Sequence, residues 1–274
     1  MPKLCHASNI IRKYGDRKTT SKQKAALDAI VVEYKKYITH VLNITTYDEQ
    51  SIREKVDCLN TYYNFIHNAG YDNTFSSQGK FRPTILEEFM YLLFKDILSE
   101  KKTAYDKYDT LASGSVKAYS NLFFKPSSFE SFVKKPEIGI NEKDQDYAIY
   151  RTFKLSIDGK GEKTVRVPAV AIEVKTYIDK TMLDSIIATA EKLKSGNPYT
   201  LFIAVSEWYD VSTDVDPSYS RIDQIYVLRK GKHKSTWNNI DSNIVLSVFN
   251  SIQKHLERPW SDVKRRLEED GVII

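Results

Sequence analysis

The feature of this chain that most constrains its fold is an apolar segment that carries two opposite charges one residue apart. Residues 169–176 read Ala-Val-Ala-Ile-Glu-Val-Lys-Thr, a pattern typical of a buried β-strand. Because alternate side chains of a strand point to opposite faces, Glu173 and Lys175 share one face with two alanines. The other face holds the apolar side chains of Val170, Ile172 and Val174. Charges on a buried strand are costly unless they are paired or used, so the segment predicts a functional site.

A second strand precedes this one and is joined to it by a tight turn. Residues 147–157 alternate in polarity, and the next four residues, Asp-Gly-Lys-Gly, are a strong turn signal. An antiparallel hairpin brings the beginning of its first strand near the end of its second. It therefore places Asp144 or Asp146 beside Glu173. An acidic residue followed two positions later by lysine is by itself a weak signal, because the same pattern also begins at Asp16, Glu33, Glu100, Asp158 and Asp262.

The remaining patterns after the charged strand predict a mixed sheet flanked by helices. We expect a helix at about 181–195, strands at 199–209 and 222–228, and helices at about 243–256 and 261–269. The order strand, strand, helix, strand, strand, with helices on either side, is typical of an α/β fold around a mixed sheet.

The N-terminal quarter of the chain reads as helical. Residues 1–20 are polar and basic and are expected to form an irregular arm, whereas 21–42 and 48–67 have helical spacing and predict a helical hairpin. This divides the chain into an N-terminal unit, 1–75, and a core, 76–274, which together could form one continuous domain.

A strong helix is expected to start at Thr84 and to carry a buried carboxylate. Thr84 and Glu87 fit a capping box, which gives Glu87 a structural role. Glu88 instead lies among apolar helical neighbours. A carboxylate on a buried face is often functional, and the alternative is a partly exposed glutamate on an imperfect apolar stripe.

Composition excludes several classes of protein and site. Two cysteines cannot supply a disulfide framework or a cysteine-based zinc site, and they fit a reducing cytosol. The five histidines are scattered without metal-ligand spacing. No segment resembles a signal peptide or a membrane span, so we expect a cytoplasmic protein without a membrane partner. The net charge of +5 suits a polyanion such as DNA but is too small to prove one.

Two carboxylates and an ammonium group on neighbouring strands suit magnesium-dependent chemistry at a phosphate. Magnesium prefers oxygen ligands and keeps several waters. It acidifies a bound water and neutralises phosphate charge, while a nearby lysine positions the water or stabilises the transition state. Glu88 is the candidate for a third carboxylate. The alternative is a structural ion pair of Glu173 with Lys175 or Arg166 on an exposed strand face.

Taken together, these motifs resemble the PD-(D/E)XK nuclease superfamily. More narrowly, they are similar to type II restriction endonucleases such as the subunits of BbvCI and its heterodimeric relatives, which cut a short asymmetric site with two different subunits. The resemblance covers about residues 75–205 and rests on three segments, Gln78–Phe89, Lys143–Ile149 and Ala171–Thr176.

The resemblance implies a restriction-endonuclease-like sheet and a set of catalytic residues. Those residues are Asp146, Glu173, Lys175 and Glu88. On the family pattern the three carboxylates bind Mg²⁺ and the lysine acts on the water or the phosphate. The chain has Gln145 where the family has proline, which keeps Asp144 open as an alternative, although Asp146 directly precedes the apolar start of the strand.

The implied function is that of a type II restriction endonuclease subunit, which hydrolyses double-stranded DNA at a short specific sequence. One nuclease site cuts one strand, so double-strand cleavage implies a homodimer or pairing with a different subunit of the same fold. The alternatives are a non-catalytic DNA-binding or regulatory protein on this fold and a DNA repair nuclease. The expected DNA contacts, each with a solvated loop as the alternative, are Gln78, Lys80, Arg82, Arg229, Lys230, Lys232 and Lys234.

Overall fold

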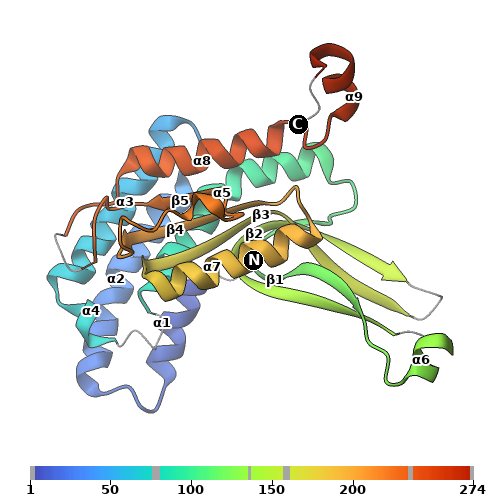
Figure 1. Ribbon diagram of the computed structural model, residues 1–274. Coiled ribbons are helices and arrows are strands. Elements are labelled where there is room, and N and C mark those ends of the chain that lie inside the picture. Colours follow the sequence, from blue (N-terminus) through green and yellow to red (C-terminus); the bar gives the residue numbers. More distant parts are fainter. Residues whose placement is uncertain (1–3, 76–80, 135–136, 157–160, 234–236, 272–274) are drawn as a thin grey trace.

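The fold is built on a five-stranded mixed sheet, seen in a computed structural model that describes residues 4–75, 81–134, 137–156, 161–233 and 237–271 (Figure 1). The strand order is β1-β2-β3-β4-β5, with antiparallel pairing from β1 to β3 and parallel pairing from β3 to β5. The strands are β1 (Leu111–Phe124), β2 (Ile138–Ser156), β3 (Glu162–Ile178), β4 (Leu201–Tyr209) and β5 (Gln224–Val227). The predicted α/β fold is confirmed.

Helices cover both faces of this sheet. The first face packs on a large apolar core with five helices: α1 (Cys5–Gly15), α2 (Ser21–Asn43), α3 (Glu49–Asn68), α5 (Pro83–Tyr105) and α8 (Ser242–Glu257). The second face packs on α7 (Lys180–Gly196), which connects the parallel strands β3 and β4. The remaining short helices are α4 (Tyr71–Thr74), α6 (Phe129–Lys134), a 3₁₀ turn at Pro217–Tyr219, α9 (Val263–Arg265) and a π turn at Arg266–Asp270.

The N-terminal helical hairpin is confirmed, but the expected irregular arm is a helix. Thr20 caps α2 through a capping box with Gln23, and the Asp48 side chain caps α3. Residues 5–15 form α1, which buries His6, Asn9 and Ile10. Residues 1–20 are polar and basic overall and so read as an irregular arm, although Cys5–Gly15 is amphipathic and buries one face. The large core contains residues on both sides of position 75, from Ile10 in α1 to Ile252 in α8.

Helix α5 starts differently from the expected capping box. Pro83 occupies its first turn, and Arg82 stands at the N-cap without a side-chain cap bond. Because proline is favoured at the first helical position, the helix begins one residue earlier than predicted. The Thr84 hydroxyl therefore lies inside the first turn and donates to the Phe81 carbonyl oxygen at 2.8 Å. The structural role expected for Glu87 as a capping-box partner is not found.

The long edge strand β1 precedes β2 and pairs with it. The predicted hairpin of β2 and β3 is confirmed, with Ser156 opposite Glu162 at its closed end. Residues 158–160 of the predicted turn lie outside the described part of the chain. Among the described residues, no helix has the length and apolar content needed to cross a membrane.

Candidate active site

The site forms where β2 leaves its partner strand. The pairing of β2 with β3 begins at Tyr147 and Ile172, so Asp146 lies just beyond the ladder, next to Glu173. Against β1, the same part of β2 is bulged between residues 145 and 148. A backbone N–H of β3 that loses its strand partner needs another acceptor. The Asp146 carboxylate supplies it, since its Oδ2 accepts from the Val174 N–H at 2.8 Å.

Lys175 joins the two carboxylates. Its Nζ donates to Oδ2 of Asp146 at 3.1 Å and to Oε2 of Glu173 at 2.8 Å. The predicted alternation of β3 is confirmed, because Val170, Ile172 and Val174 belong to the large core and Ala171 to the smaller core under α7. Glu173 and Lys175 therefore share the face of the sheet that carries α7.

The three groups are partly shielded from solvent and electrostatically coupled. The exposed fraction of the side chain is 12% for Glu173, 27% for Asp146 and 29% for Lys175. Burial raises the pKa of Glu173; the Lys175 charge opposes this shift, and the Asp146 carboxylate adds to it. Burial alone would lower the pKa of Lys175, but the two carboxylates raise it above its ordinary value. Lys175 therefore stays protonated at neutral pH, and the ionised cluster has one more negative than positive charge.

The structure distinguishes the two candidate aspartates by position. Asp146 contacts both the backbone and the lysine of β3, whereas Asp144 is exposed and lies opposite Lys117 of β1. Asp146 is thus the aspartate that the hairpin brings to Glu173, as the apolar start of the strand predicted.

Glu88 is buried as expected, and its carboxylate holds the start of α1. Its Oε2 accepts from the backbone N–H groups of His6 at 2.8 Å and Ala7 at 3.2 Å, and its Oε1 accepts from the Tyr34 hydroxyl at 2.8 Å. An anion at a helix N-terminus is stabilised by the free N–H groups and the helix dipole. Burial raises the pKa of Glu88, and these three hydrogen bonds oppose the shift.

Glu88 and Asp146 line one cavity but do not form a single ligand cluster. The cavity, of about 790 Å³, lies between α1, α5, β1 and β2, and Glu87 also lines it. Within the described residues, no group of three or more His, Cys, Asp or Glu side chains is arranged to hold a metal ion. The described geometry therefore brings together Asp146, Glu173 and Lys175 and leaves Glu88 apart from them.

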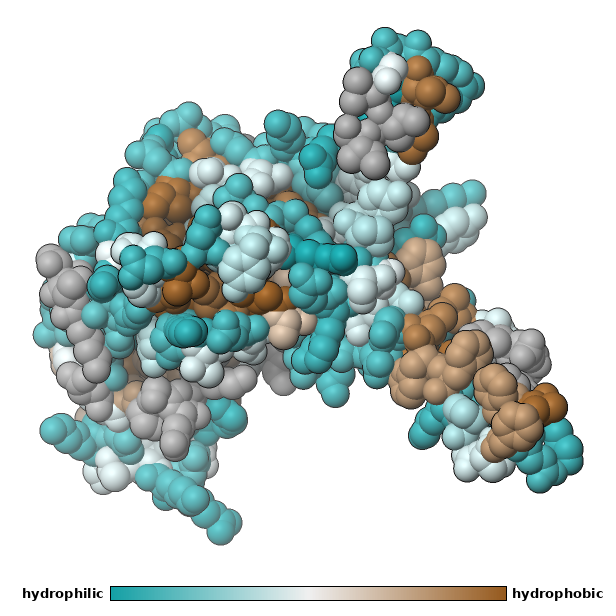
Figure 2. Space-filling model, viewed as in Figure 1, coloured by the Kyte–Doolittle hydropathy of each residue, from teal (hydrophilic) through white to brown (hydrophobic). Residues whose placement is uncertain are grey.

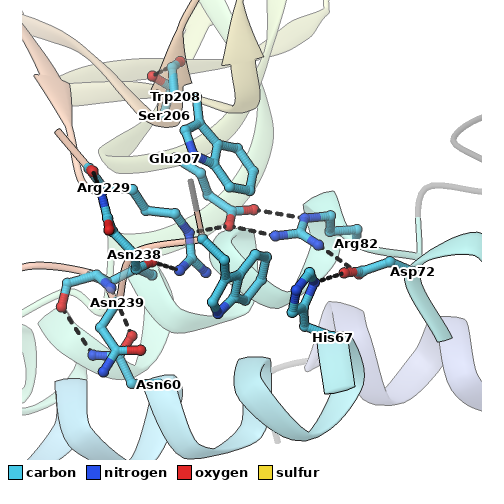
Figure 3. A network of polar contacts seen from close by, with 12 residues as sticks. Asn60, His67, Asp72, Arg82, Ser206, Glu207, Trp208, Arg229, Asn238 and Asn239 are labelled. Atoms are coloured by element: carbon cyan, nitrogen blue, oxygen red, sulfur yellow. Dashed lines mark hydrogen bonds and ion pairs between the residues drawn. The ribbon is translucent and has the colours of Figure 1, made fainter. Parts of the chain in front are cut away.

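Two of the expected DNA contacts, Arg82 and Arg229, lie in a buried polar network that Figure 3 shows from close by. Arg82 binds Glu207 in a fork, with Nε to Oε1 at 3.0 Å and Nη2 to Oε2 at 2.8 Å, and it also pairs with Asp72. Arg229 is 1% exposed; its Nε donates to Oε2 of Glu207 at 2.8 Å and its Nη1 to the carbonyl oxygen of Asn238. These positions do not suit the expected contacts, because both guanidinium groups are already engaged inside the protein.

Aromatic rings enclose the same network. Tyr63, Trp208 and Trp237 each lie within 5.4 Å of both guanidinium carbons, measured to the ring centroids. Sequence reasoning missed Glu207, although a signal existed. It lies in the strand segment Leu201–Trp208, which is otherwise apolar except for one serine, and a carboxylate there requires a buried cation.

The other expected DNA contacts are divided between exposed and undescribed residues. Lys230 is 63% exposed at its side chain and pairs with Asp241. Lys232 is also exposed. Gln78, Lys80 and Lys234 lie outside the described residues.

Comparisons with known proteins agree with this fold. The family model described as Bpu10I restriction endonuclease matches residues 78–244. A solved structure described as the native BbvCI A2B2 tetramer at low resolution is similar, with a TM-score of 0.72 and 19% sequence identity over 92% of this chain and 95% of that chain. A comparison with curated protein sequences gives no significant match.

Proposed function

Because the chain belongs to the Bpu10I restriction endonuclease family, we propose that it is a type II restriction endonuclease subunit that hydrolyses DNA at a short specific sequence with Mg²⁺. The observation that carries the proposal is the contact of Lys175 with both Asp146 and Glu173 at the point where β2 leaves β3. This arrangement places two oxygen-ligand groups and one cation at an opening of the sheet.

The donor set fits magnesium. Asp146 and Glu173 would hold the ion, because hard divalent cations prefer carboxylate oxygens and the cluster has an excess negative charge. Bound there, the ion supplies an acidified water and neutralises charge on the phosphate. Burial of Glu173 strengthens its attraction for a cation, since charges interact more strongly where water is excluded.

Lys175 acts on the substrate as a hydrogen-bond donor. Its raised pKa keeps it protonated, so it does not take a proton from water in this arrangement. Its ammonium group can instead donate to a phosphate oxygen and stabilise the charge that develops during hydrolysis. Asp146 is fixed by the Val174 N–H, which holds one carboxylate oxygen in place before any ligand binds.

Glu88 has a supporting role in this proposal. The backbone of α1 and the Tyr34 hydroxyl already use both of its oxygens. It therefore fixes α1 against α5 beside the cavity that Asp146 also lines. These hydrogen bonds use both carboxylate oxygens and hold Glu88 in its place beside α1.

The proposed partners are double-stranded DNA and a second nuclease subunit. One Asp146–Glu173–Lys175 site cuts one strand, so double-strand cleavage requires a second site, on another copy or on a different subunit of the same fold. The similar structure is described as an A2B2 tetramer, which supports an assembly of this kind. Gln78, Lys80, Lys230, Lys232 and Lys234 stay candidates for DNA contacts.

The test is cleavage of plasmid DNA in Mg²⁺ by the Lys175→Ala and Glu173→Ala variants. Each variant is assayed alone and together with the protein that the neighbouring gene encodes. We expect both variants to lose cleavage and to keep sequence-dependent binding, measured by gel shift in Ca²⁺. Lys163→Ala removes an exposed lysine from the same strand and should cleave normally. In a heteromeric complex, the two site variants should nick one strand. Full double-strand cleavage by either variant would exclude the assigned site.

A further inference from the structure

The hairpin of β1 and β2 ends in a tip that projects from the body of the molecule and carries α6 (Figure 1). We call residues 121–134 and 137–140 the arm tip. Asp146 lies eight residues from the start of β2, which is roughly 26 Å along an extended strand. The arm tip is therefore separate from the candidate active site.

The arm tip exposes an unusual number of large apolar side chains. Phe129 is 82% exposed and Val133 65%. The exposed set is Leu122, Phe123, Phe124, Phe129, Phe132 and Val133. Figure 2 shows the patch as a brown area on the projecting part at the lower right. Most surface apolar residues occur singly, so six in 12 residues indicate a covered surface.

The local structure holds these side chains outward. Phe129, Phe132 and Val133 have the spacing i, i+3, i+4 and so form one stripe of α6, which has no buried residue. On the neighbouring strands, the Phe123 ring lies over Gly139, where a Cβ atom would be 2.2 Å from the ring. The Phe123 ring thus covers the backbone at Gly139 and stays partly exposed.

The exposed area is large enough for a specific interface. A buried phenylalanine covers 150–250 Å², so the four rings and two aliphatic side chains expose roughly 600 Å² of apolar surface. A standard interface covers about 800 Å² on each partner. The arm tip alone therefore supplies most of one side of a stable protein contact.

The charges of the arm tip do not suit DNA. Residues 121–140 contain three lysines and two glutamates, and Glu130 pairs with Lys134 on α6. The remaining charge is too small to attract a phosphate backbone, which requires several cations. A partner that presents a similar apolar surface with few charges fits this patch best.

We propose that the arm tip is the contact between two copies of this chain, related by a two-fold axis. In a two-fold contact the same patch lies on both sides and must complement itself. The arm tip meets this requirement because its stripe is apolar and its two α6 charges compensate each other. The contact is independent of the proposed hydrolysis, so a failure of one does not imply a failure of the other.

The test is the solution mass of the full chain, measured by light scattering during size-exclusion chromatography in the absence of DNA. Wild type should elute as a dimer, at twice 31.7 kDa. Phe129→Glu with Phe132→Glu should be monomeric, because two charges on each copy would then face an apolar surface. Phe124→Glu should weaken the dimer independently. Val32→Glu with Leu42→Glu changes two exposed apolar residues of α2 and should leave the dimer intact.

Circular dichroism and thermal unfolding should show that the arm-tip variants fold, as α6 buries no residue. A monomeric wild type at micromolar concentration would overturn the proposal, including the case in which mass increases only when a different subunit is added. So would a dimer that survives all arm-tip substitutions. Arm-tip variants that keep the dimer mass but lose DNA binding would show that the arm tip contacts DNA, and this result would also overturn the proposal.

Discussion

Replacing Glu207 with leucine should destabilise the protein strongly without involving its chemistry. Glu207 is the only carboxylate that contacts both Arg82 and Arg229 among the described ion pairs, and its side chain is 1% exposed (Figure 3). The substitution leaves two guanidinium groups in an apolar setting, one of them fully buried. Asp72 compensates Arg82 only in part, and it does not contact Arg229.

The size of the effect follows from the desolvation of an unpaired ion. Removing one partner of a buried ion pair costs about 3–5 kcal/mol. Because Arg229 loses its carboxylate partner while Arg82 keeps Asp72, we expect a loss of about 4 kcal/mol. In a chain of this size a loss of about 4 kcal/mol lowers Tm by roughly 10 °C. The rings of Tyr63, Trp208 and Trp237 exclude water, and their cation–π contacts with Arg229 offset part of the cost.

The assay is urea unfolding followed by tryptophan fluorescence, with a thermal melt for comparison. The matched control is Glu191→Leu, which breaks an exposed pair with Arg221 and should cost less than about 1 kcal/mol. Replacing Glu207, Arg82 and Arg229 together with apolar residues should recover most of the loss, since no fully buried charge is then left unpaired and Asp72, which is 19% exposed, still contacts His67.

Two results would refute this reasoning. The first is a loss of stability for Glu207→Leu that is no larger than the loss for Glu191→Leu. The second concerns Arg229→Met, whose folded fraction should bind DNA as tightly as wild type. A lower salt dependence of binding, with a slope reduced by about one, would show that Arg229 contacts a phosphate and is not confined to the core.

Other variants test the supporting residues. Glu88→Ala removes three hydrogen bonds to a carboxylate and should lower the free energy of unfolding in urea by about 3 kcal/mol, while the folded enzyme keeps its cleavage rate. Loss of cleavage with unchanged stability would instead make Glu88 a metal ligand. Burial lowers the pKa of His6 from 6.5 to about 3. Between these two pH values only the unfolded chain takes up a proton at this residue, so the protein becomes less stable as the pH is lowered. His6→Asn should reduce the slope of this pH dependence by about 1 kcal/mol per pH unit on average between pH 7 and 5, and an equal slope would contradict the assignment. Lys230→Ala and Lys232→Ala should each weaken DNA binding and lower its salt dependence if they contact phosphates, and unchanged binding would exclude both.

The sequence predicted the part of the site that depends on strand geometry. The alternation of β3 and its hairpin with β2 are local patterns, and they place Asp146, Glu173 and Lys175 together. Position along the hairpin also distinguishes Asp146 from Asp144, since only the residue next to the last strand pair reaches β3.

The sequence did not predict contacts between distant parts of the chain. Arg82 and Glu207 are 125 residues apart in the sequence. A basic residue in a polar loop gives the same sequence pattern whether it contacts DNA or a buried carboxylate. Glu88 is a similar case. Its burial followed from its apolar neighbours, but its partners, the start of α1 and Tyr34 of α2, lie 54 to 82 residues away along the chain.

Asp146 shows why the candidate site and the fold are difficult to separate. On one edge β3 stays paired with β4 through Glu173, Val174 and Lys175, while on the other edge it loses β2. The opening gives a ligand access, but it leaves the Val174 N–H without a strand acceptor. One oxygen of Asp146 fills that position, so the carboxylate that we assign to magnesium also completes the sheet. Loss of cleavage in an Asp146 variant therefore has two possible causes, whereas among the described residues Lys175 donates only to side chains, so a Lys175 variant leaves the backbone pairing of the sheet intact.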